Sequence, residues 1–196
     1  MQFFEKSEPH GHLEIWKHYP DGSKELHFKD DNVICSGMGA TLAEMFDADP
    51  TVDVENFQCI YFRCGSGGQE SYQVSSRSDV EESFSRAQYG TGNLDMSIHN
   101  LIANGAKTTS LPFGVIPYGY IKRITPTKCM WQIVLDEQTL NVGDETPEGY
   151  INEIGLYSKN PYVESPDASM LCAYRYFKKI YKTDAFILVF RWTIEF

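Results

Sequence analysis

Four histidines near the start of the chain are the one cluster in the sequence that resembles a set of metal ligands. They are His10, His12, His18 and His27. Zinc requires three or four convergent ligands held in place by further hydrogen bonds, and no cysteine lies near these histidines in the sequence. The first two also belong to a flexible-looking segment, Pro9–His12. We therefore interpret the histidines as exposed strand residues and predict no metal site.

The five cysteines show no pattern of ligands or disulfides. They are Cys35, Cys59, Cys64, Cys129 and Cys172, an odd number, scattered and mostly flanked by apolar residues. A free cysteine behaves as a small, commonly buried hydrophobe. Cys59 and Cys64 are five positions apart, unlike the two-residue gap of zinc knuckles and redox motifs. Both are predicted to be structural.

Glycine-rich segments give no catalytic signature. Gly65–Gly68 and Gly90–Asn93 lack the Lys-Ser/Thr ending of a phosphate loop and the strand-to-helix setting of a dinucleotide fold. The segment Cys64–Gly68 is close to the Gly-x-Ser-x-Gly nucleophile elbow, but its spacing is wrong by one residue. Carboxylates are plentiful, yet spacing alone identifies no acid/base pair. The sequence predicts a non-enzymatic protein with no catalytic residue and no cofactor.

Charge and hydropathy limit the partners. The 196 residues carry 17 basic and 27 acidic side chains, a net charge of −10. Nucleic acids and anionic membranes are bound mainly through Lys and Arg, so neither is an expected partner. The densest basic group is Arg175, Lys178, Lys179 and Lys182. We interpret it as a solvated turn between two strands.

Nothing in the sequence suggests export or membrane insertion. No run of 18 apolar residues occurs, and the segment Met1–Lys6 lacks the basic and apolar regions of a secretory signal. We expect the chain to fold in a cytoplasm.

The first half of the chain predicts a hairpin, a helix and a strand. His12–Tyr19 and Lys24–Lys29 flank a strong turn signal at Pro20–Ser23. Asp30–Asn32 is predicted to end the second strand. Apolar residues at helical spacing predict a short helix over Ser36–Phe46. Phe57–Cys64 is predicted to be a buried strand.

Residues 65–114 are polar, rich in Ser, Gly and Asn, and without a convincing period. At most one short helix is predicted there, over Val80–Ala87. Unstructured segments of this length are uncommon in compact domains and are usually functional or bound to a partner. This excursion is therefore the predicted interaction surface.

Strands dominate the second half. Tyr118–Thr125 and Lys128–Asp136 are predicted to form a hairpin, followed by strands over residues 150–157 and 170–177. The last twelve residues alternate without exception, with large apolar side chains on one face at Phe186, Leu188, Phe190, Trp192, Ile194 and Phe196. Such a face must be covered by a second layer. The predicted fold is mainly β: a single domain over residues 1–196, built as a two-layer antiparallel β-sandwich with one or two short helices.

The C-terminal third resembles the closing segment of tailed-bacteriophage structural proteins. The resemblance lies in three phrases: Ile151–Tyr157, Met170–Phe177, and Ile180–Thr183 continuing into Phe186–Phe196. Neck, collar, tail and baseplate-associated proteins often carry a similar Glu-x-Gly-Leu-(Phe/Tyr) phrase and a Leu-x-Val-x-Trp-x-Ile-x-Phe ending. The expected Arg is displaced by one position at Tyr174-Arg175, so no role is assigned to that Arg.

The resemblance implies a non-enzymatic virion subunit, first of all at the neck or collar of the head–tail junction. A baseplate or tail-fibre attachment protein is the alternative within the virion. Two further classes stay open: a carbohydrate-binding sandwich with exposed Tyr and Trp side chains, and a hydrolase without a recognised motif. The expected partners are copies of the chain and other virion proteins, with neither nucleic acid nor membrane, and the expected location is the virion after synthesis in the host cytoplasm.

Overall fold

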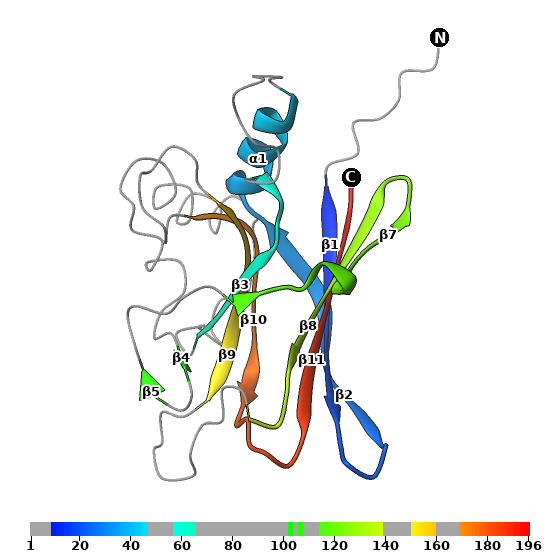
Figure 1. Cartoon of the computed structure of the whole chain (residues 1–196), viewed down its shortest axis with the longest axis vertical. Coiled ribbons are helices and arrows are strands. Elements are labelled where there is room, and N and C mark those ends of the chain that lie inside the picture. Colours follow the sequence, from blue (N-terminus) through cyan, green and yellow to red (C-terminus); the bar gives the residue numbers. More distant parts are fainter. Residues whose placement is uncertain are drawn as a thin grey trace.

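The chain folds mainly as antiparallel strands with one α-helix in the part that the structure describes (Figure 1). This computed structural model describes residues 9–46, 57–65, 102–103, 106–107, 114–138, 150–159 and 169–196. The elements are β1 (His10–His18), β2 (Lys24–Ile34), α1 (Ser36–Phe46), β3 (Tyr61–Gly65), β4 (Ile102–Ala103), β5 (Ala106–Lys107), β6 (Gly114–Val115), the 3-10 helix η3 (Tyr118–Tyr120), β7 (Ile121–Thr125), β8 (Lys128–Leu135), β9 (Ile151–Lys159), β10 (Ser169–Ile180) and β11 (Ile187–Glu195).

Nine of these strands form one continuous sheet in the order β6-β3-β9-β10-β2-β1-β11-β8-β7, while β4 and β5 pair only with each other. The sheet curls into a half-barrel, so that its two halves face each other (Figure 1). The predicted mainly β, antiparallel class is confirmed. The predicted two-layer sandwich is not confirmed, because no break divides the strands into two separate sheets.

Strand β2 is the reason that the sheet is continuous. The prediction that this strand ends at Asp30–Asn32 is wrong, because these residues stay paired with β1 and the strand runs on to Ile34. Val33 and Ile34 then pair with Tyr174 and Ala173 of β10. One long strand therefore belongs to both halves of the sheet.

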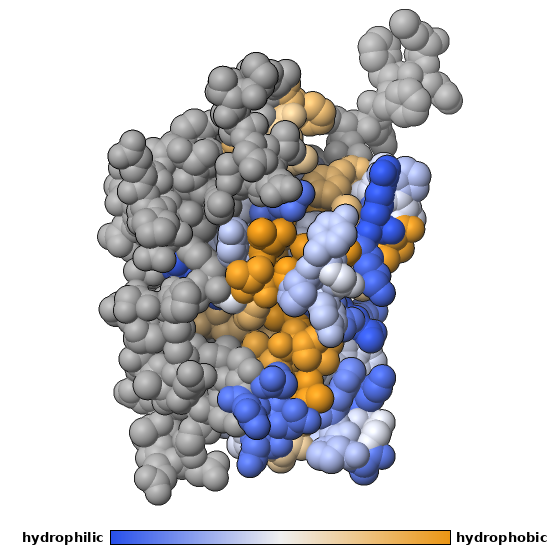
Figure 2. All heavy atoms as spheres, viewed as in Figure 1, coloured by the Kyte–Doolittle hydropathy of each residue, from blue (hydrophilic) through white to orange (hydrophobic). Residues whose placement is uncertain are grey.

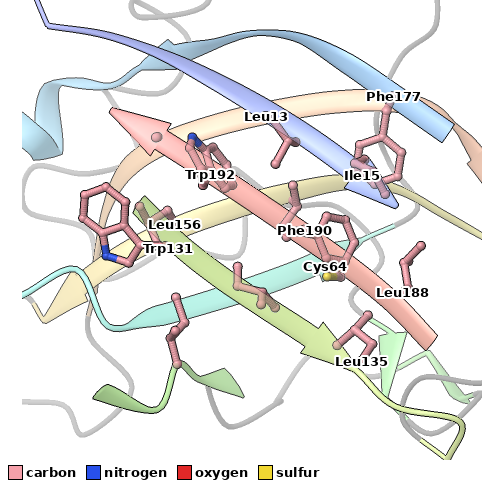
Figure 3. Packing of buried hydrophobic residues seen from close by; sticks show 14 of the residues in the cluster. Leu13, Ile15, Cys64, Trp131, Leu135, Leu156, Phe177, Leu188, Phe190 and Trp192 are labelled. Carbon is pink, nitrogen blue, oxygen red and sulfur yellow. The ribbon is translucent and has the colours of Figure 1, made fainter. Parts of the chain in front are cut away.

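An apolar core fills the space between the two halves (Figure 3), and a smaller cluster of Val33, Cys35, Tyr157, Leu171 and Tyr174 is separate from it. The half that contains β1, β11 and β8 contributes Leu13, Ile15, Phe190 and Trp192, among others. The half that contains β3, β9 and β10 contributes Cys64, Ile154, Leu156 and Phe177. The rings of Phe177 and Phe190 lie 6.0 Å apart, so strands from opposite halves are in direct contact.

The terminal strand behaves as its alternation predicts. Five residues of the apolar face are buried: Phe186, Leu188, Phe190, Trp192 and Ile194. Phe196 is partly buried and packs against the same core. Because β11 pairs with β1 on one side and β8 on the other, it is an interior strand of the sheet.

The two edge strands of the sheet are consecutive in the chain. Strand β6 pairs with β3 at one edge, β7 pairs with β8 at the other, and residues 116–120 cross between them. Across the same gap, the indole N–H of Trp131 on β8 donates to the carbonyl of Cys59, just before β3, at 2.7 Å. This bond ties the two ends of the sheet together, and we call this region the seam.

The seam explains two wrong strand boundaries. Tyr118–Tyr120 is a 3-10 helix instead of the start of a strand, because the chain must turn there to cross from one edge to the other. The strand predicted over Phe57–Cys64 begins only at Tyr61. Before that point, Cys59 instead supplies the backbone carbonyl that accepts the seam hydrogen bond from Trp131.

The remaining sequence predictions fall into two groups. The helix Ser36–Phe46 and both hairpins are confirmed, including the first turn, where Gly22 has a φ of +84°. Strands β9 and β10 are longer than predicted. The helix predicted over Val80–Ala87 and most of the excursion 65–114 lie outside the described residues.

Replacing Trp192 with Ala should destabilise the fold strongly. The side chain is fully buried, and truncating a buried Trp or Phe typically costs about 3–5 kcal/mol. Thr193 faces the other side of the sheet and is half-buried, so Thr193→Ala should cost less than about 1 kcal/mol. Denaturant melts of the two variants beside wild type measure the difference. Equal midpoints for Trp192→Ala and wild type would contradict the assignment of β11 to the core.

Candidate functional site

Polar residues interrupt the core-facing side of β2. Asp30 lies opposite Leu13 in the ladder with β1, and Asn32 lies opposite Gly11. Cross-strand partners point to the same face of a sheet, so both polar residues share the face of the buried Leu13. Apolar residues resume on this face at Ile34. Polar residues at core positions that the fold does not require are typical of functional sites.

The interruption coincides with a groove between β2 and β10, which we call the junction groove. The two strands pair only at Val33 and Ile34, and they diverge beyond that point. The groove has a volume of about 540 Å³, within the range of roughly 300–1,000 Å³ typical of small-molecule sites. Its lining residues are Pro9, His10, Gly11, Asp30, Asp31, Asn32, Val33, Ile34, Arg175 and Tyr176.

Arg175 connects the two sides of the groove. Arg175 and Phe177 are two positions apart on β10, so their side chains share one face of the sheet, and Phe177 belongs to the core. The guanidinium forms an ion pair with the carboxylate of Asp30 across the groove. It also lies 5.5 Å from the ring centre of Phe28 and 5.2 Å from that of Tyr176. The charge is therefore offset by Asp30 and held in place by two aromatic rings.

Gly11 makes room for Asn32. A β-carbon at position 11 would overlap the side-chain oxygen of Asn32 and come within 2.9 Å of the carbonyl oxygen of Thr193. The amide nitrogen of Asn32 donates to the carbonyl of Val33 at 3.4 Å. Its Oδ1 atom is buried and accepts no hydrogen bond from the described residues. Nε of Arg175 is also buried and donates no hydrogen bond to the described residues.

Charged side chains form an outer rim next to the groove. His12 Nδ1 lies 2.5 Å from the carboxylate of Asp31, and His10 Nε2 lies 3.7 Å from that of Glu195. Lys128 also contacts Glu195, at 2.7 Å. The hydrogen bond from Lys128 lowers the pKa of Glu195, so this carboxylate is charged at neutral pH.

The four histidines do not converge. His10 and His12 are exposed on β1, and their ring centroids lie 6.4 Å apart. His18 is half-buried at the other end of that strand, roughly 26 Å from His10 along the strand. His27 is half-buried too, and its Nε2 lies 3.3 Å from the carbonyl oxygen of Lys178. Among the described residues, no three His, Cys, Asp or Glu side chains are grouped closely enough to hold a metal ion.

The basic group of the C-terminal third is not the solvated turn that the sequence predicts. Arg175, Lys178 and Lys179 belong to β10. Lys182 follows that strand and is fully buried, with its ammonium donating to the carbonyl of Thr183 at 2.7 Å. Burial lowers the pKa of Lys182, while the nearby acidic residues Asp136, Glu137 and Asp184 act in the opposite direction.

The cysteine and glycine motifs do not form a site in the described residues. Cys59 and Cys64 are both buried in the core, as expected of structural cysteines, and burial raises the pKa of the Cys64 thiol. Gly65 ends β3. Residues 66–68 and Gly90–Asn93 lie outside the described residues.

A second polar group lies on the opposite face of β9 and β10. Glu153 is fully buried and accepts a hydrogen bond from the hydroxyl of Tyr174 at 2.7 Å. Burial and the Glu153 charge raise the pKa of Tyr174, so it stays protonated as a donor. Arg63 lies 5.6 Å from the ring centre of Tyr157 on the same face. These buried polar contacts hold neighbouring strands together.

The sequence alone does not predict the junction groove, because the three polar residues Asp30–Asn32 resemble the end of a strand. The period-two pattern contained a signal, since Phe28 and Ile34 occupy the same face with Asp30 and Asn32 between them. The second side of the groove, at Arg175, depends on the pairing of β2 with a strand about 140 residues away in the chain. That pairing leaves no local trace in the sequence.

Comparison with known proteins adds no relative. No protein-family model, no curated protein and no solved structure matches this chain. In the described part of the chain, no helix is both long and apolar enough to span a membrane.

Replacing Gly11 with Ala should displace Asn32 and destabilise the junction. Overfilling a packed site typically costs about 1–3 kcal/mol. Asn32→Ala added to Gly11→Ala should recover part of the loss, because it removes one of the two clashing groups while the carbonyl of Thr193 remains. Thermal melts of the single and double variants measure this coupling. Strictly additive effects would show that the two residues do not interact.

Metal removal should leave the protein unchanged, because no three potential metal ligands converge among the described residues. The measurement is the melting temperature before and after chelation, together with the metal content of the purified protein. Stoichiometric zinc, with a lower melting temperature after chelation, would contradict the prediction.

Proposed function

We propose that this chain is a non-enzymatic structural subunit of a tailed-phage virion, at the neck or collar of the head–tail junction. The observation that carries the proposal is the resemblance of the C-terminal third to such proteins. The phrases that carry it occupy β9, β10 and β11, and their apolar residues build the shared core. The subunit is synthesised in the host cytoplasm, assembles with its own copies and other virion proteins, and binds neither nucleic acid nor membrane.

An exposed apolar surface supports assembly. Four large hydrophobic side chains of the segment from β6 to β7 are exposed, and we call them the β6–β7 patch: Val115, Tyr118, Tyr120 and Ile124. Tyr118 is the most exposed, at 82 %. Figure 2 shows hydrophobic side chains gathered over the middle of one face, in the region where Figure 1 draws β6 and β8; tyrosine lies on the hydrophilic side of its colour scale, so the orange atoms do not include Tyr118 and Tyr120. Exposed apolar groups that gather in this way are typical of protein–protein contacts.

The adjacent edge strand favours another copy of the chain as the partner. Among the described residues, β7 pairs only with β8, so the other edge of its backbone is available for hydrogen bonds. Lys122 and Arg123 lie on this strand and are exposed. A copy of a chain with a net charge of −10 complements this basic edge. Repetition of such a contact between identical subunits generates a ring.

Two alternatives remain as proposals of lower rank. The first alternative is a baseplate or tail-fibre attachment protein, which the same resemblance supports. In this alternative the same patch forms the contact at another position in the virion. The second alternative is a carbohydrate-binding module. It is supported by the two halves of the sheet, which face each other as the layers of a sandwich do. The exposed tryptophans expected for such a module are absent, since Trp131 and Trp192 are buried and Trp16 is half-buried.

Electron microscopy and sedimentation of the purified chain test the assembly. The expected result is a closed ring of subunits, and labelling with a specific antibody should then mark the neck of the particle. Labelling at the tail tip would favour the baseplate alternative. A chain that is absent from purified particles, as measured by mass spectrometry, would contradict both virion proposals.

Substitution within the β6–β7 patch should weaken the assembly. Tyr118→Ser removes the most exposed aromatic ring of the patch, and we expect at least a tenfold increase in the subunit concentration needed for assembly. Tyr181→Ser is the matched control, because Tyr181 is also exposed, at 57 %, but lies outside the patch. Sedimentation over a concentration series measures both. Equal effects of the two substitutions would contradict a role of the patch.

A further inference from the structure

The junction groove offers hydrogen-bond acceptors and a donor from two strands that the chain brings together. Asp30 and Asn32 come from β2, and Arg175 comes from β10. The charge of Arg175 is offset by Asp30. A second carboxylate, Asp31, is exposed at the rim. The groove therefore combines strong hydrogen-bonding capacity with little unbalanced positive charge.

We propose that the junction groove binds a neutral, polyhydroxylated ligand: a sugar residue of a glycan. A hydroxyl group both donates and accepts, so neighbouring hydroxyls match a carboxylate or amide oxygen beside a guanidinium. Because Asp30 and Arg175 offset each other's charge, the pair attracts neither an anion nor a cation, and a neutral ligand with both donors and acceptors matches it best.

The aromatic side chain at the groove fits the same class of ligand. Tyr176 lines the groove and is half-buried. A Tyr ring offers an apolar body and a polar tip, which suits the mixed surface of a sugar ring. The volume of about 540 Å³ admits a small ligand of this kind.

Two atoms in the lining have unused hydrogen-bonding capacity. Oδ1 of Asn32 is an acceptor and Nε of Arg175 is a donor, and neither has a partner in the described part of the chain. Buried polar atoms without partners are uncommon in native structures and call for a specific reason. A modest rotation of either side chain toward a bound hydroxyl supplies the missing bond. The inference does not depend on the virion proposal, because it rests on the groove alone.

A glycan array followed by NMR titration tests the proposal. The sugar retained best on the array is added to isotope-labelled protein, and inorganic phosphate and Ca²⁺ are added in parallel as charged probes. The sugar should shift the Nε–H signal of Arg175 and the amide signals of Asp30 and Asn32. Neither charged probe should do so.

Asn32→Ala is the matched variant, because it removes an unpartnered acceptor from the lining of the groove. It should weaken sugar binding at least tenfold, whereas Gln138→Ala, an exposed amide outside the groove, should not change it. Three results would overturn the proposal: no glycan retained, signals shifted away from the groove, or phosphate or Ca²⁺ bound there instead. Sedimentation without sugar reports on the virion proposal separately, so either can fail alone.

Discussion

The structure depends on one constraint: a single sheet must bury its apolar face against itself. Strand β2 makes this possible because it pairs with β1 along most of its length and with β10 at Val33 and Ile34. The two halves can then fold toward each other and share a core in which Phe177 contacts Phe190. The seam bond from Trp131 to the carbonyl of Cys59 holds the other ends of the sheet together.

The same constraint produces both candidate functional surfaces. Strand β2 belongs to both halves, but it pairs with β10 only at Val33 and Ile34. Beyond these residues β2 and β10 diverge, and the space between them is the junction groove. The crossing between the two edges of the sheet places Tyr118 and its neighbours outside the core, on the β6–β7 patch. The apolar interior explains stability, while the groove and the patch are the surfaces at which we propose contacts with other molecules.

Sequence reasoning predicted the elements better than their arrangement. The alternation from Phe186 to Phe196 specified a buried strand because period two depends on local residue types alone. The continuation of β2 through Asp30–Asn32 was missed, because three polar residues resemble a turn unless the strand that pairs with them is known. The burial of Lys182 was missed for the same reason, since burial of a charged side chain is decided by distant neighbours. The candidate groove therefore lay beyond what local patterns specify.

The indole N–H of Trp131 tests the single curled sheet most directly. The three tryptophans give three indole signals in an NMR spectrum, and Trp16, which bonds to Glu14 in a half-buried position, serves as the internal reference. The account predicts that the Trp131 signal exchanges with solvent much more slowly than that of Trp16 and shows a nuclear Overhauser effect to the backbone near Cys59. Fast exchange of Trp131, with no such effect, would show that the ends of the sheet are not joined and would contradict the shared core.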